Sequence, residues 1–271
     1  MSIPRIGWPA HWSRERRSLA SIVLASLVLV ASLWVSASII ALAPEPIGSS
    51  AQTFADGTAM TVKLTVVSGV IGLVLGLLAA LGKVSRVPPL RWLCSFYIWV
   101  IRGTPLLVQI FFVYFALPVL AQKSGSPWLE EASKMTEFTA AVLALSLNVG
   151  AYNAESFRAG LLAVPRGQFE AARSLGLGRL HTLVDITFPQ AFKVALPPLV
   201  SNIVALLKDT SLAYSIGVLE LVNAGQRLQS RTFEPVPVLI TTAILYLVMT
   251  TLLTKITNAI EHYYDIEGRL S

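Results

Sequence analysis

The chain has 271 residues, of which 54% are hydrophobic and 13% are charged, and its mean hydropathy is +0.66. Soluble domains carry roughly 25% charged residues, so this composition argues against a soluble protein and favours one that folds in a lipid bilayer. The net charge of +6 is then interpreted as the Lys and Arg excess of cytoplasmic loops, and no nucleic acid is expected as a partner.

Residues 1–57 are expected to contain a basic N-terminus, a first transmembrane helix and an external loop. The uncharged run over 18–44 is long enough to span, since a spanning helix needs about 20 apolar residues. The hydrophobic region of a signal peptide is only about 7–15 residues, and Pro44 follows a poor cleavage site. We therefore expect an uncleaved first span, followed by the turn-rich external stretch 44–58.

The second uncharged run covers 64–82 and contains Gly72 and Gly76, a spacing that permits close contact with another helix. A basic turn over 83–91 is expected in the cytoplasm. The third predicted span, 92–121, is interrupted by Arg102-Gly103-Thr104-Pro105. Proline removes a backbone donor and kinks a helix, so we expect this span to be broken. The polar stretch 122–137 is expected outside.

The remaining predicted spans cover 138–154, 194–207 and 235–254. The polar group Lys208-Asp209-Thr210-Ser211 follows the fifth span, and the apolar piece 212–219 comes next, which predicts two half-elements about a polar break. The stretch 223–234 is expected outside. Most of the 21 Lys and Arg residues then lie in segments assigned to the inside, which predicts that both termini are cytoplasmic.

A polar, helix-forming stretch over 165–189 lies between the fourth and fifth spans. Pro165 ends one helix, Gly167 begins the next, and Gly176 stands where a helix end needs a positive φ. Leu180, Leu183, Val184 and Phe188 continue with helical spacing. The sequence therefore predicts an all-α, polytopic membrane protein with about six transmembrane helices and a cytoplasmic helical hairpin. From periodicity alone, this hairpin could equally be an interfacial connection between two spans.

Four motifs resemble those of the permease subunits of bacterial ABC importers, in the polar amino-acid uptake branch (histidine, glutamate, glutamine and arginine type). They are Glu170-Ala171-Ala172 with Gly176, Arg102-Gly103-Thr104-Pro105-Leu106-Leu107-Val108-Gln109, Ala151-Tyr152-Asn153-Ala154-Glu155, and Leu207-Lys208-Asp209-Thr210-Ser211-Leu212. The resemblance covers roughly 58–262, identifies about 165–189 as the EAA loop, and leaves 263–271 as a cytoplasmic tail. It implies the type I importer transmembrane fold, ATP-driven amino-acid import and a bacterial inner-membrane location.

The resemblance also implies the partners. These are two copies of an ABC ATPase, a second permease subunit that is identical or different, and a periplasmic or extracellular amino-acid-binding protein. The residues implied in ATPase coupling are Gly167, Glu170, Ala171, Ala172, Arg173, Gly176, Leu177 and Gly178. The sequence contains no G-x-x-x-x-G-K-[ST] motif, so ATP and magnesium are expected on the ATPase, with no cofactor or catalysis in this chain.

Polar residues at membrane depth point to function. The candidates for the substrate path are Tyr152, Asn153, Glu155, Arg102, Gln109, Asn202, Lys208, Asp209, Thr210 and Ser211. Glu155 suits a substrate ammonium or a local pair with Arg158, and the sequence leaves both open. Arg102 suits a substrate carboxylate, although snorkelling or bracing of the break is favoured. The three histidines are scattered, so no metal site is expected.

Two other functions remain open on the residues alone. An ion-coupled secondary transporter would explain the helix breaks, because such proteins build sites from discontinuous helices. It would not explain the hairpin, and its usual duplicated halves are not found in this sequence. A non-transporting membrane scaffold would explain the hairpin, but it would leave the intramembrane polar residues without a role.

Overall fold

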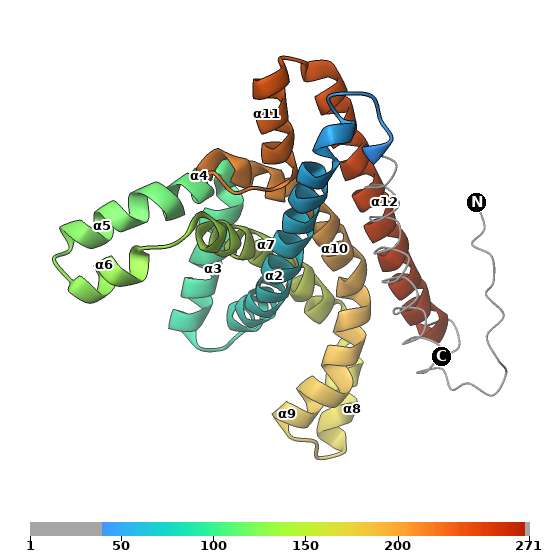
Figure 1. The fold of residues 1–271 in the computed structure, drawn as a ribbon. Helices are drawn as coiled ribbons and strands as arrows, with labels where there is room; N and C mark the ends of the chain where they lie inside the picture. Colours follow the sequence, from blue (N-terminus) through green and yellow to red (C-terminus); the bar gives the residue numbers. More distant parts are fainter. Residues whose placement is uncertain (1–39, 269–271) are drawn as a thin grey trace.

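The computed structural model describes residues 40–268, and every regular element in that range is helical (Figure 1). Most of the first predicted span therefore lies outside the described residues. The α-helices are α2 (Ala51–Lys83), α3 (Pro88–Gly103), α4 (Leu106–Phe111), α5 (Leu117–Lys123), α6 (Pro127–Ser133), α7 (Glu137–Ala163), α8 (Arg166–Ser174), α9 (Arg179–His181), α10 (Phe188–Asp209), α11 (Leu221–Thr232) and α12 (Pro235–Gly268). Shorter segments are η1 (Gly48–Ser50), η2 (Phe112–Ala116), η3 (Thr182–Thr187) and η4 (Thr210–Ile216).

Helix α7 is the centre of the molecule, and α2 and α10 pack along it. The close approach of α2 depends on Gly72 and Gly76, as the small-residue spacing predicts. A Cβ atom at Gly76 would lie 2.5 Å from the Cβ of Asn153 and 3.0 Å from the carbonyl oxygen of Gly150. On the other side, α12 packs against α10 and α11. The predicted contact of the α2 glycines with another helix is confirmed.

In the described range, four helical segments are long and apolar enough to cross a membrane: Gly48–Lys83, Leu106–Lys123, Thr182–Ile216 and Pro235–Thr257. The predicted span 138–154 falls on α7, which is not among them. Most residues between Ala140 and Gly160 are buried by neighbouring helices. A helix enclosed by protein does not need a lipid-like surface, so α7 accommodates polar side chains.

The third predicted span is two helices rather than one kinked helix. Thr104 has φ −122° and ψ 147°, and Pro105 has φ −63° and ψ 136°, so the chain is extended between α3 and α4. The helices then run in different directions, and α5 and α6 form an arm that projects from the other helices (Figure 1). The break at Pro105 is therefore confirmed and is more complete than expected.

Two other expectations require correction, and one stretch gains an element that was not expected. The predicted half-elements about 208–211 form one continuous helical segment, because η4 directly extends α10 before the chain ends it at Gly217 with φ 94°. The stretch 223–234 was expected outside with no element assigned to it, and most of it belongs to α11, whose Leu221 and Leu228 are buried. Helix α2 already begins at Ala51, within the expected loop 44–58. In the last two cases, packing against other elements adds helix to a sequence with weak local signals.

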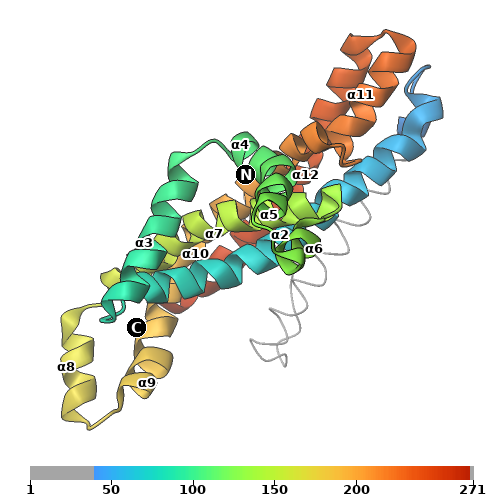
Figure 2. The same cartoon turned by 90° about the vertical axis from the view of Figure 1, so that its left-hand side faces the viewer.

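The hairpin of α8 and α9 and the helix α11 lie at opposite ends of the molecule (Figures 1 and 2). On the predicted topology, the hairpin end faces the cytoplasm and the α11 end faces outward.

Candidate functional site

The first helix of the hairpin, α8, begins and ends where the sequence predicts. Pro165 precedes α8 in an extended conformation, with φ −60° and ψ 141°. At the other end, the amide of Gly176 donates to the carbonyl of Arg173 (3.0 Å), and the amide of Leu177 donates to the carbonyl of Ala172 (3.0 Å). Gly176 has φ 71°, so these bonds form the glycine-dependent helix end known as the Schellman motif. The predicted positive φ is confirmed.

The hairpin exposes apolar side chains among charges. Ala172 is buried, whereas Glu170, Ala171 and Arg173 are exposed. Leu175 and Leu180 are 77% and 69% exposed. Apolar side chains gathered on one polar element are typical of a surface that another protein covers.

Two short joints connect the hairpin to the core. Only Val164, which is buried, and Pro165 separate α7 from α8. On the other arm, α9, η3 and α10 follow one another without a loop. Helices α7 and α10 also touch beside the hairpin, since a Cβ at Gly160 of α7 would lie 3.1 Å from the carbonyl carbon of Ala191 in α10. The hairpin is therefore rigidly attached to both α7 and α10.

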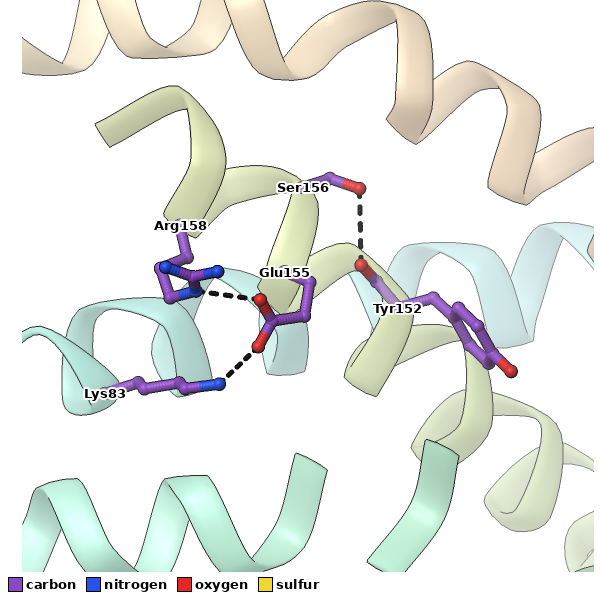
Figure 3. Close-up of polar contacts among 5 residues, drawn as sticks. All are labelled: Lys83, Tyr152, Glu155, Ser156 and Arg158. Carbon is purple, nitrogen blue, oxygen red and sulfur yellow. Dashed lines mark hydrogen bonds and ion pairs between the residues drawn. The ribbon is translucent and has the colours of Figure 1, made fainter. Parts of the chain in front are cut away.

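Glu155 lies between two cations at the hairpin end of α7 (Figure 3). Arg158 Nε donates to Glu155 Oε2 at 2.8 Å, and Lys83 Nζ pairs with Glu155 Oε1. The side chain of Glu155 is 17% exposed. Of the two interpretations of Glu155, the structure therefore supports the local pair with Arg158. Lys83 was not expected here, because it is 72 residues away in sequence.

Gln109 lies against the end of α3. Its Nε2 atom donates to the carbonyl oxygens of Ile101 (2.7 Å) and Thr104 (3.1 Å), and its Oε1 atom accepts from Asn148 Nδ2 (3.0 Å). The hydroxyl of Thr104 donates to the carbonyl of Val100 at 2.9 Å. These bonds supply partners to backbone groups that the break at Pro105 leaves without helical ones.

Arg102 and Tyr152 form a second pair beside this break. The guanidinium carbon of Arg102 lies 5.1 Å from the centroid of the Tyr152 ring, a cation–π contact. Both residues are exposed, and Arg102 has no carboxylate partner within the described part of the chain. A Cβ at Gly103 would meet nothing within 4 Å. Of the candidates for the substrate path, this pair faces open space.

Asn202 connects α10 to α7. Its Nδ2 atom donates to Asn153 Oδ1 at 3.0 Å and to Ser156 Oγ at 3.3 Å, and Ser156 in turn donates to the carbonyl of Tyr152 (Figure 3). Asn153 is fully buried, and its Nδ2 atom has no partner in the structure.

The last candidates lie where α10 becomes η4. Within residues 40–268, neither Lys208 nor Asp209 forms an ion pair with another helix, and Lys208 is exposed. Thr210 is buried and donates to the carbonyl of Leu207 at 2.7 Å, as expected for a hydroxyl at a helix irregularity. Ser211 is half-buried beside it.

Glu220 is a buried carboxylate that sequence reasoning missed. Its Oε1 atom accepts from the amide of Asn223 (2.8 Å), and Oε2 accepts from the amide of Val222 (2.9 Å) and the hydroxyl of Tyr246 (3.1 Å). Glu220 thus caps α11, and burial raises the pKa of its carboxyl group to about 7. An acidic residue directly before an amphipathic stretch is a helix-start signal that could have revealed it.

Comparison with known proteins places the chain in a family. The family described as the inner membrane component of binding-protein-dependent transport systems matches residues 72–265. The L-cystine transport system permease protein TcyB of Bacillus subtilis (strain 168) is 40% identical over 210 residues, which are 77% of this chain and 85% of that protein. The arginine transport system permease protein ArtQ of the same organism is 37% identical over 206 residues, 76% and 90% of the two chains.

Solved structures share the fold. The crystal structure of an amino acid ABC transporter with histidines has a TM-score of 0.69 and 38% identity, covering 78% of this chain and 94% of that one. An inward-facing structure of the MetNI methionine ABC transporter has a TM-score of 0.63 at 18% identity, covering 82% and 99%, which shows the fold alone. The chain therefore belongs to the family of binding-protein-dependent transport system inner membrane components, and it is a permease subunit of the ABC importer type.

Proposed function

We propose that this chain forms part of the translocation path of an ATP-driven amino-acid importer and that its hairpin 165–189, the EAA loop, binds the ATPase. Relatives named for cystine and arginine transport support an amino acid as the cargo. The family description supports a separate binding protein that delivers the cargo and a location in the inner membrane. Both termini would then be cytoplasmic.

The hairpin is the observation that carries this proposal. It joins α7 through two residues and α10 through none, and it exposes Leu175 and Leu180 beside the charges of Glu170 and Arg173. A partner that closes on ATP could therefore move the core helices through this element. Two ATPase copies, each holding its own ATP and magnesium, would serve two permease subunits, which are identical or different.

The break beside Arg102 supports a path next to this pair. Thr104 and Pro105 are exposed and non-helical. Irregular backbone is tolerated at membrane depth only where protein covers it or water reaches it. We infer that this surface faces the second permease subunit across an aqueous path, with Arg102 and Tyr152 available to the carboxylate of the cargo.

The substitution Glu170→Ala tests the role of the hairpin. Losing one partner of a docking charge pair costs about 2–5 kcal/mol, so the ATPase should bind this variant about 30-fold or more weakly. The measurement is the affinity of the purified ATPase for the permease in nanodiscs, together with ATP-dependent uptake of labelled arginine and cystine into proteoliposomes.

Glu131→Ala is the matched control. It also removes an exposed carboxylate from a short helix, and its pair with Lys134 is an exposed one of little energetic weight. The control should bind the ATPase and transport normally. Normal uptake by Glu170→Ala would contradict coupling through this residue. Uptake that an ionophore abolishes and vanadate leaves intact would contradict ATP-driven transport altogether.

A further inference from the structure

We propose that Lys83 is a positioning residue for energy coupling, because its ion pair with Glu155 makes the inner ends of α2 and α3 move together with α7 and the hairpin. The cluster of Lys83, Glu155 and Arg158 is called the inner clamp below. The inference rests on the proposed function, since it concerns how ATPase-driven motion reaches the path.

The inner clamp consists of one carboxylate that is paired with two cations. Each carboxylate oxygen of Glu155 has its own cation, Oε1 with Lys83 and Oε2 with Arg158 (Figure 3). The side chains are only 17–33% exposed, so water and salt screen these pairs less than surface ones. The negative charge of Glu155 is thus already balanced by two cations of this chain, which favours a mechanical role over binding of a substrate ammonium.

The clamp lies close to the source of motion. Glu155 is two helical turns before Ala163, where α7 ends, and the hairpin begins two residues later. Gly160, between the clamp and this end, packs on Ala191 at the root of the other arm. Any displacement of the hairpin is therefore delivered to Glu155 through a short, continuous and well-packed segment.

Lys83 passes the motion to another part of the molecule. It is the last residue of α2, and α3 begins five residues later at Pro88. The turn is tightly packed, since a Cβ at Gly82 would overlap the sulfur atom of Cys94 in α3. Helix α3 ends at Gly103, beside Arg102. The clamp thereby links the hairpin to the break that faces the proposed path.

The glycine contacts between α2 and α7 do not make the clamp redundant. They hold the two helices where Gly72 and Gly76 meet the segment from Ser146 to Ala154, and the buried Ala79 and Ala80 extend this packing beside Ala154 and Phe157. Beyond Ala80, the ion pair between Lys83 and Glu155 joins the last turn of α2 to α7. Without it, the last turn of α2 would have no polar contact with α7, although the packing up to Ala80 would remain.

The test uses the whole importer in proteoliposomes, with ATP hydrolysis and uptake of labelled arginine and cystine measured in the same vesicles. Lys83→Met should raise the ATP consumed per amino acid imported about fivefold, the factor that corresponds to about 1 kcal/mol. ATPase binding should stay intact. Lys83→Arg keeps the charge and should restore the wild-type ratio.

Arg86→Met is the matched control. Arg86 is an exposed cation in the same turn without an ion pair in the described part of the chain, so its loss should leave the ratio unchanged. An unchanged ratio in Lys83→Met, or an equal rise in both variants, would overturn the proposal.

If the Lys83→Met importer does not assemble, a variant in which all three charges of the inner clamp are reversed tests the inference instead. The triple variant Lys83→Glu, Glu155→Lys, Arg158→Glu retains each pairing, and restored coupling would support the clamp. A triple variant that also fails to assemble would contradict it. A wild-type complex without ATP-dependent uptake would instead refute the proposed function, so the two failures are distinguishable.

Discussion

Gly76→Ala should loosen the packing of α2 on α7. The new methyl group would lie 2.5 Å from Asn153 Cβ, 3.0 Å from the Gly150 carbonyl oxygen and 3.1 Å from the Ala154 amide nitrogen. Ordinary contacts of a Cβ atom begin at 3.4 Å. Two of the three neighbours are backbone atoms that cannot rotate away, so the helices must separate by several tenths of an ångström or more.

The magnitude follows from two opposing effects. Overpacking a close contact costs about 1–3 kcal/mol, whereas Ala in place of Gly in a helix contributes up to about 1 kcal/mol of stability. We expect Gly76→Ala to lower the free energy of unfolding by about 1–2 kcal/mol. For a chain of this size, each kcal/mol lowers the unfolding midpoint by about 2–4 °C.

The assay is thermal unfolding in detergent. Unfolding is monitored by the reaction of a fluorogenic thiol reagent with Cys94, the single cysteine of the chain. Gly69→Ala is the control on the same helix. Its nearest neighbours are the methyl carbons of Ile203 (3.2 Å) and Leu206 (3.6 Å), which can shift. An unfolding midpoint for Gly76→Ala equal to or above that of Gly69→Ala would refute the packing argument.

Two further predictions concern buried polar groups. Gln109→Leu should lower the free energy of unfolding by about 1–3 kcal/mol, because it leaves buried carbonyl groups at the end of α3 without a donor. The exposed Gln122→Leu should change it little, and equal midpoints for the two variants in the same thermal assay would contradict this. Glu220 has a folded-state pKa of about 7, raised by burial from its ordinary value of 4.5. Its contribution to stability is therefore fully present below pH 4.5 and is lost as the pH rises through about 7, by at most about 3 kcal/mol. The unfolding midpoint of the wild type relative to Glu220→Gln should fall between pH 5 and pH 8, and a constant difference would show that Glu220 does not titrate in this way.

Local signals in the sequence predicted local structure well. Gly176 was expected at a helix end because its position follows a periodic stretch, and its φ is 71°. The spacing of Gly72 and Gly76 predicted a close helix contact, and Pro105 predicted the break. Each of these depends on backbone geometry within a few residues, which the side chain at one position determines directly.

Contacts between distant segments were not predictable in the same way. Lys83 and Glu155 are 72 residues apart, and no periodic pattern joins them. Helix α11 lies in a polar stretch to which the sequence assigned no element, and its packing on α2 and α12 became known only from the structure. Helix α7 is buried by neighbours, so its burial depends on the fold rather than on its own hydropathy.

Family membership argues against both alternative functions that the residues left open. An ion-coupled transporter and a membrane scaffold were both compatible with parts of the sequence. The match over residues 72–265 and the relatives named as transport system permeases favour neither. The hairpin and the broken helix therefore belong to one importer subunit, and they need not be explained separately.

The structure also separates the intramembrane polar residues by what they already bind. Gln109 caps the end of α3, Asn202 joins α10 to α7, and Glu155 is held by two cations. A buried polar group that exchanged these partners for a passing solute would have to leave its own partners unsatisfied, at a cost of about 1–3 kcal/mol for each. Arg102 and Tyr152 are exposed and have no such obligation. Polar character at membrane depth therefore identifies helix-positioning residues as readily as candidate cargo contacts, and the exposure of the side chain distinguishes the two.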